Sequence, residues 1–177
     1  RVEFSTTGTN TVVDVAGDFI FNSTNASGTR SLLVTTGTCV VNIAGNFSMN
    51  APGGNLRFAT GAAGIGTLNI SGDFDLQAGT LSESGGTTAN GNINFIGADV
   101  IHQFSNAGII SNTINYLIPA TNTLVVQNES NVSGTTNSSL TVNGTLVVES
   151  ENATGAIITG TGSGLGNVRV TNRVYNP

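Results

Sequence analysis

A pattern of alternating apolar and polar positions recurs along the chain, and each copy has a glycine at its centre. Three close copies, which read apolar, x, apolar, x, Gly, x, apolar, x, apolar, occupy Val13–Phe21, Val41–Met49 and Leu68–Leu76. Weaker copies follow at Ile93–Ile101 and Leu140–Val148. Side chains two positions apart lie on one face of an extended chain, so the alternation predicts β-strands and no sustained helix.

The spacing of the copies is that of coils in a solenoid. The central glycines recur at intervals of 28, 27, 25 and 47 residues, at Gly17, Gly45, Gly72, Gly97 and Gly144. The last interval is close to two periods, so a hidden copy is expected at Thr123–Asn128. A coil of about 25 residues cannot bury its apolar face alone, and coils must stack with parallel strands. The sequence thus predicts an all-β fold, a parallel β-solenoid with about 25 residues per coil, wound as a right-handed β-helix.

Stacking places equivalent residues of successive coils in columns along the molecule. Three inward columns are predicted, comprising Phe19, Phe47 and Phe74, then Val15, Ile43 and Ile70, then Phe21, Met49 and Leu76. One outward column carries side chains suited to a ladder of amide hydrogen bonds, at Asp14, Asn42, Asn69, Asn94 and Thr141. The central glycines share the parity of the apolar set, so Gly17, Gly45 and Gly72 are expected to face inward at corners.

No domain boundary is evident, and residues 1–177 are interpreted as a single β-solenoid segment, an excerpt of a much longer chain. Between Ser105 and Pro119 the glycine motif lapses, which predicts either an insertion or a change in coil size. Two glycine-rich stretches, Gly61–Gly66 and Gly160–Gly166, are predicted to be turns. Neither opens a helix, and a phosphate-binding P-loop needs a lysine, which the chain lacks.

Composition narrows the range of partners. Only 8% of the residues are charged, lysine is absent and the formal net charge is −5, so no basic surface exists to neutralise a run of phosphates. No apolar run approaches the roughly 20 residues of a membrane span. We therefore expect no nucleic-acid partner and no transmembrane segment. The single cysteine excludes an intrachain disulfide framework.

One group of polar residues offers candidate chemistry. Asp73 and Asp75 share the outward face of a strand, and Asn46 is predicted beside them on the preceding coil. This patch could bind Ca²⁺ or hold the acid groups of a polysaccharide-cleaving site, although a solvated strand face is the simpler interpretation. His102 and Cys39 have no catalytic partner nearby in sequence, so both are expected to be structural. Beyond this patch no catalytic, cofactor or metal site is predicted.

Several segments of the sequence resemble those of a known group of proteins. TLNISGDFDLQAGT, VNIAGNFSMN and the stretch from SSLTVNGTLVVES to the last residue resemble the low-charge Gly/Thr/Asn repeats of very large Bacteroidota cell-surface proteins. These include gliding-motility adhesins and other cargo of the type IX secretion system. The resemblance implies export across the outer membrane, an extended stalk, and contact with secretion or outer-membrane anchoring machinery through other parts of the chain.

The sequence favours a structural or adhesive repeat module, a stalk or fibre, of a secreted or surface-exposed bacterial protein. It is expected to be extracellular, to need no cofactor, not to be an enzyme, and to meet surface polysaccharide as a candidate partner. A carbohydrate-active β-helix, either lyase or hydrolase, is one alternative, because this fold class hosts such sites. An ice-binding solenoid is another, although Thr7–Thr9 and Thr36–Thr38 begin a Thr-x-Thr array that the next coil does not continue.

Overall fold

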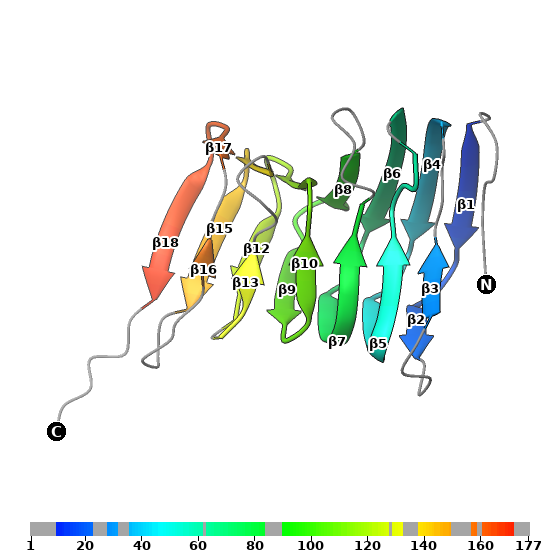
Figure 1. Cartoon of the computed structure of the whole chain (residues 1–177). Helices are drawn as coiled ribbons and strands as arrows, with labels where there is room; N and C mark the ends of the chain where they lie inside the picture. Colours follow the sequence, from blue (N-terminus) through cyan, green and yellow to red (C-terminus); the bar gives the residue numbers. More distant parts are fainter. Residues whose placement is uncertain are drawn as a thin grey trace, which may run out of the picture.

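Two parallel β-sheets run along the molecule, because each coil contributes one strand to each of them (Figure 1). The structure is a computed structural model, and it describes residues 10–22, 28–31, 36–61, 63–83, 90–127, 129–132, 138–149, 157–158 and 161–171. Over this part of the chain every helix or strand assigned is a strand, and all paired strands are parallel.

The strands of the two main sheets follow one another in chain order. Sheet A has seven strands: β1 (Thr11–Val15), β4 (Thr36–Ile43), β6 (Ala63–Ile70), β8 (Asn90–Phe95), β11 (Ile114–Ile118), β14 (Ser139–Val142) and β17 (Thr161–Ser163). The main path of sheet B comprises β2 (Phe19–Asn22), β5 (Phe47–Arg57), β7 (Phe74–Ser82), β9 (Ile101–Asn106), β12 (Thr123–Val126), β15 (Thr145–Glu149) and β18 (Asn167–Thr171).

Short strands form a third side of the coils. In sheet B, β3 (Gly28–Ser31) pairs with the end of β5, and β10 (Ile109–Ser111) pairs with the end of β7. A separate small sheet joins β13 (Asn131–Val132) to β16 (Ile157–Ile158). The chain therefore winds from sheet A to sheet B and returns along this third side.

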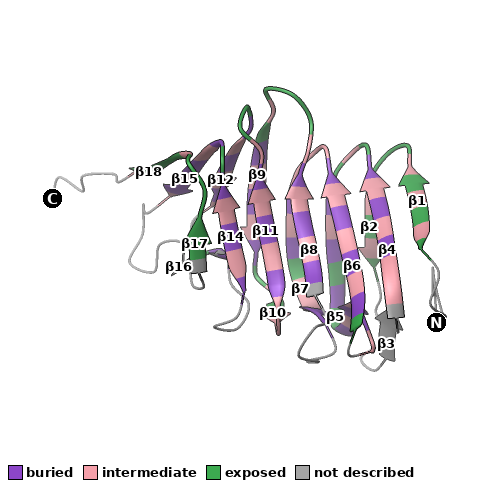
Figure 2. Ribbon diagram, turned by 90° about the horizontal axis from the view of Figure 1, so that it is seen from above, coloured by how far each residue is buried: buried purple, intermediate pink, exposed green. Residues whose placement is uncertain are grey.

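The strand register confirms the parallel β-solenoid and its repeat of about 25 residues. Residues whose side chains bond to an adjacent coil are 20 to 30 positions from their partners in sequence. The hidden copy expected at Thr123–Asn128 forms β12, which pairs with β9 and β15. Buried residues alternate with less buried ones along the strands, as in Gly64–Ile70 of β6 (Figure 2). Between Ser105 and Pro119 the stacking continues through β10 and β11, so the lapse of the motif marks a change in coil size.

The aromatic column of the core is longer than predicted. The rings of Phe19, Phe47 and Phe74 stack as expected, with centroids 5.7 and 5.0 Å apart. A fourth ring, Phe104, lies on Phe74 with centroids 4.7 Å apart and planes 5° from parallel. The register confirms the other two inward columns, which are Val15, Ile43 and Ile70, and Phe21, Met49 and Leu76.

The prediction for Ile93–Ile101 is wrong in its second half. Ile101 is 65% exposed, whereas His102 and Phe104 are buried. In the first coil, Phe19 of the aromatic column comes four positions after Val15. In the later coil, Phe104 of the same column comes nine positions after Phe95. The longer corner changes which parity of β9 faces inward.

The central glycines do not face the core, contrary to the prediction. Gly45 and Gly72 are half-buried, and a Cβ on either would meet the corner of the preceding coil. At Gly45 this Cβ would lie 2.8 Å from the carbonyl carbon of Gly17 and 2.9 Å from the backbone nitrogen of Asp18. The glycine is therefore required because successive corners pack backbone against backbone.

The two glycine-rich stretches are not simply turns. Gly64 and Gly66 lie within β6, and Gly162 lies within β17. A Cβ on Gly66 would meet the backbone and Cβ of Phe58, and a Cβ on Gly91 would lie 2.9 Å from the ring of the same residue. These glycines leave room inside the coil for the buried Phe58.

Candidate functional site

The candidate residues Asn46 and Asp73 belong to a ladder at the corner between sheets A and B. Asp18 Oδ1 accepts a hydrogen bond from the backbone N–H of Asn46 at 2.7 Å. Asn46 Oδ1 accepts from the N–H of Asp73 at 2.8 Å, and Asp73 Oδ1 accepts from the N–H of Gln103 at 2.7 Å. We call these four residues the corner ladder. Asp18, Asn46 and Asp73 each tie their own coil to the next through Oδ1.

The structure brings the three candidate residues together. Asn46, Asp73 and Asp75 line an open hollow of about 270 Å³ on the outer face of sheet B, together with Asp18 of the first coil. Asp75 Oδ2 accepts a hydrogen bond from Gln77 Nε2 at 2.6 Å. Within the described ranges no group of three or more His, Cys, Asp or Glu is arranged to hold a metal ion. The patch is thus built from groups that first serve to stack the coils.

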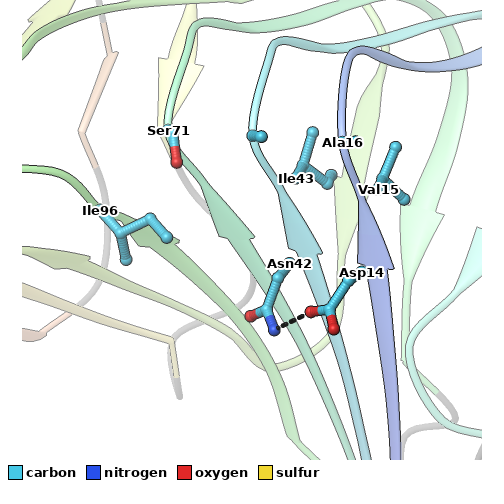
Figure 3. Close-up of a pocket in the computed structure, with 8 residues that line it drawn as sticks. Asp14, Val15, Ala16, Asn42, Ile43, Ser71 and Ile96 are labelled. Atoms are coloured by element: carbon cyan, nitrogen blue, oxygen red, sulfur yellow. Dashed lines mark hydrogen bonds between the residues drawn. The ribbon is translucent and has the colours of Figure 1, made fainter.

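A second ladder runs along the outer face of sheet A. Asn42 Nδ2 donates to Asp14 Oδ1 at 2.7 Å, beside a hollow of about 270 Å³ (Figure 3). Asn69 Nδ2 donates to Asn42 at 2.8 Å, and Asn94 Nδ2 donates to Asn69 at 2.9 Å. These bonds confirm the predicted column up to its fourth member. Thr141 does not continue it directly, because Leu117 lies between Asn94 and Thr141 in the register.

His102 is held in the core by two hydrogen bonds. Its Nδ1 lies 2.6 Å from the carbonyl oxygen of Gly72, and its Nε2 lies 3.3 Å from Nδ2 of Asn122. A carbonyl accepts and an amide nitrogen donates, so these partners select the neutral tautomer with hydrogen on Nδ1. The imidazole is fully buried and bridges adjacent coils, which matches the structural role expected for it.

Two further residues bear on the sequence predictions. Cys39 is 1% exposed, and burial raises the pKa of its thiol, which lowers the fraction of reactive thiolate.

Thr38, in the second Thr-x-Thr stretch, donates from Oγ1 to Asn10 Oδ1 at 2.9 Å. Residues 7–9 lie outside the described residues. Neither Thr38 nor Cys39 joins the hollow that Asn46 and Asp73 line.

Sequence reasoning missed Asn122, which organises the wider corner beside His102. Its Nδ2 donates to the carbonyl oxygen of Phe95 at 2.9 Å, and its Oδ1 accepts from the N–H of Val100 at 3.3 Å. The residue is 1% exposed. The sequence does contain one signal for this role, an asparagine shortly after Pro119. This combination is typical of turns in which the asparagine side chain bonds to the backbone.

Tyr116 gives the first testable prediction. The residue is 3% exposed, its hydroxyl oxygen finds no hydrogen-bond partner in the described part of the chain, and burial raises its pKa well above the ordinary value of 10.0. Tyr116→Phe removes a buried unpaired hydroxyl, so we expect it to leave the unfolding free energy unchanged or to raise it by about 1 kcal/mol. Urea unfolding near neutral pH measures this change.

The same substitution should change the dependence of stability on pH. In the unfolded chain a tyrosine ionises near pH 10, while buried Tyr116 stays neutral to higher pH. The stability that comes from the neutral hydroxyl is therefore complete below about pH 10 and falls as the pH rises above it. Tyr116→Phe should fall less steeply than the unchanged protein over this range. Parallel slopes would show that the hydroxyl reaches solvent.

In the part of the chain that the structure describes, no helix has the length and apolar character that a membrane span requires.

Comparisons with known proteins find no match for this chain. No protein-family model matches the sequence, and no curated protein and no solved structure is significantly similar to it.

Proposed function

We propose that this chain is a structural or adhesive repeat module that serves as a stiff stalk or fibre segment of a secreted or surface-exposed bacterial protein. One observation carries the proposal: side-chain contacts run from coil to coil, without a gap, through the first four coils of the solenoid. Four stacked rings, Phe19, Phe47, Phe74 and Phe104, form one such line inside it. The asparagine ladder on sheet A and the corner ladder form two more outside.

These lines support stiffness for a physical reason. Bending the rod would open one side of every coil interface, and each interface carries backbone hydrogen bonds, a buried apolar column and at least one side-chain bond in the first coils. Parallel pairing repeats at about 4.8 Å per coil, so length grows with coil number while the cross-section is kept. A module of this kind can hold a binding element at a distance from its anchor.

The proposed location rests on sequence character. The scarcity of charge, the abundance of Thr, Ser and Asn, and the resemblance to Bacteroidota surface repeats favour an extracellular protein. Type IX secretion and outer-membrane anchoring are proposed to act on other parts of the longer protein. Surface polysaccharide is the proposed class of ligand for the whole assembly.

The carbohydrate-active alternative gains no specific support from the acidic hollow. Asp18 and Asp73 each commit one carboxylate oxygen to a backbone N–H, and Asp75 is bonded to Gln77. A polysaccharide-cleaving site needs one carboxyl free to give a proton and a second that stays ionised. The stiffness experiment therefore includes an assay for polysaccharide cleavage.

The test measures stiffness along the molecule. Donor and acceptor fluorophores are attached at Ala16 and Leu165, both exposed and near opposite ends, through cysteines in a Cys39→Ala background. We expect one narrow distance that is insensitive to salt and crowding agents. The same labelled chain in denaturant provides the flexible control. A distance distribution as broad as the control would contradict the proposal, and release of reducing ends from a polysaccharide panel would favour the enzyme.

A further inference from the structure

The asparagine ladder on sheet A uses only part of the hydrogen-bonding capacity of its amides. An asparagine side chain offers two N–H donors and an oxygen with two lone pairs. Asn42 and Asn69 each donate one N–H to the preceding coil and accept one from the next coil, at 2.7 to 2.9 Å. One N–H and one lone pair of each amide therefore have no partner among the described residues. Because the amide is planar and its bonded groups lie along the ladder, the unused groups point away from the sheet.

The unused groups form a regular row along the molecule. The strand register sets one ladder residue on each of β1, β4, β6 and β8, namely Asp14, Asn42, Asn69 and Asn94. Neighbouring strands lie about 4.8 Å apart, so the same kind of group recurs at this interval. A ligand that bonds to every rung must itself have a repeating structure. The row therefore suits a linear polymer that lies along the solenoid axis.

A second row of polar groups runs beside the first over the later coils, two positions earlier on each strand. Asn92 Nδ2 donates to Thr67 Oγ1 at 3.4 Å, and Asn115 Nδ2 donates to Asn92 Oδ1 at 3.3 Å. Ser139 Oγ donates to Asn115 Oδ1 at 2.9 Å. Over these coils the outer face of sheet A thus presents amides and hydroxyls in two neighbouring columns.

An open hollow of about 270 Å³ borders the first row on its other side (Figure 3). It is lined by the polar residues Asp14, Asn42 and Ser71 and by the apolar residues Val15, Ala16, Ile43, Ala44 and Ile96. All of these belong to strands of sheet A or to the corners that directly follow them. Coils added at either end of the molecule would cover the ends of the sheets and leave this outer face open.

The chemistry of this face favours a neutral polysaccharide among linear polymers. A hydroxyl both donates and accepts, so it matches an amide that offers one donor and one acceptor, whereas a peptide backbone presents its donors and acceptors separately. The carbon-bound hydrogens of a sugar ring suit the apolar lining of the hollow. Among the described residues of the ladder and the hollow, only Asp14 is ionisable, and the net charge of the chain is −5. An acidic polymer would therefore be repelled.

We propose that the outer face of sheet A binds a neutral linear polysaccharide along the solenoid axis, with sugar hydroxyls on the asparagine ladder and sugar rings over the hollow. The proposal rests on the proposed function and gives its polysaccharide ligand a site on this chain. Each coil adds an equivalent contact, so a polymer should be held more tightly than a disaccharide of the same sugar.

Affinity electrophoresis tests the site, with xyloglucan, galactomannan, laminarin or dextran in the gel and alginate as the acidic comparison. At least one neutral polymer should retard the unchanged chain, and alginate should not. Asn69→Leu removes a central rung of the ladder, whereas Ala44→Leu fills the hollow and leaves the ladder bonds in place. Each substitution should raise the dissociation constant roughly 10-fold, because each removes one part of the contact.

Gln127→Leu is the matched control. It makes the same change from amide to leucine on the outer face of sheet B, where Gln127 Nε2 donates to Gln103 Oε1 at 3.4 Å. This variant should bind as the unchanged chain does. Thermal unfolding followed by circular dichroism establishes which variants are folded. Ala44 is exposed, so Ala44→Leu keeps the test decisive if Asn69→Leu does not fold.

Three results would overturn the proposal: no retardation by any of the neutral polymers, unchanged binding by a folded Asn69→Leu or Ala44→Leu variant, or equal weakening by Gln127→Leu. The fluorophore distances report stiffness without any sugar present. A stiff chain that binds no polysaccharide would therefore refute this site alone, and a flexible chain that binds one would refute the rod alone.

Discussion

Replacing Phe74 by alanine is expected to lower the unfolding free energy by about 3–5 kcal/mol, because it leaves a cavity in the middle of the core. The ring is 1% exposed and stacks between Phe47 and Phe104 at centroid distances of 5.0 and 4.7 Å. Both ring contacts are lost together, which adds to the cost of the cavity. Urea unfolding followed by circular dichroism measures the change.

Phe19→Ala is the matched control for this prediction. Phe19 occupies the same column but lies at its end, is only partly buried, and has a single ring neighbour, Phe47, at 5.7 Å. We expect it to cost clearly less than Phe74→Ala. Equal losses from the two substitutions would mean that the column is not a continuous stack, and the register of sheet B would then be in doubt.

Replacing Gly45 by alanine is the second substitution with a large expected effect. The added Cβ would lie 2.8 and 2.9 Å from backbone atoms of Gly17 and Asp18, and backbone cannot move aside as a flexible side chain can. We expect a loss of about 1–3 kcal/mol, the range for overpacking, together with weakening of the bond from the Asn46 N–H to Asp18. Denaturant midpoints measure the loss.

Gly17→Ala provides the comparison, since it makes the same chemical change at the same position of the repeat. With nothing within 4 Å of the added Cβ, its effect should stay within about 0.5 kcal/mol. A large loss at Gly17 would indicate that conformational preference, and not the contact between corners, explains the glycines.

The regular part of the repeat could be read from the sequence because local alternation and global stacking impose the same pattern. Period-two alternation fixes which side chains point inward, and the nearly equal intervals of 28 and 27 residues between the first three coils fix which residues stack. The columns of Phe19 and Val15 follow from these two facts alone. The ladder from Asp14 to Asn94 follows in the same way, since stacked amides bond to their neighbours.

The wider corners could not be read in this way. Matching the motif aligns Leu146 with Phe19, whereas the register places Val148 in the aromatic column. From β9 onward the corner between sheets A and B holds extra residues, and contacts with the neighbouring coil determine where these residues lie. His102 and Asn122 occupy that space, and their partners are backbone groups of other coils, which no local pattern reveals.

The three residues of the candidate patch lie together as predicted, but the chemistry of the patch could not be judged from spacing. Sequence reasoning brought Asn46, Asp73 and Asp75 to one outer face, and all three line one hollow. Which oxygens are free depends on backbone N–H groups of the adjacent coil, and these become visible only in three dimensions. Asp73 looks like a candidate ligand in the sequence and is a rung of the corner ladder in the fold.

The central claim, a stiff rod built of equivalent stacked coils, is tested most directly by removing one coil. Deleting residues 43–69 joins Asn42 to Ile70, the register partner of Ile43, and takes out one complete turn. Fluorophores at Ala16 and Leu165 then report the length. We predict a folded protein whose single distance is shorter by about 4.8 Å, the spacing of adjacent strands. An unfolded product, or a folded one whose distance does not shorten, would contradict the account.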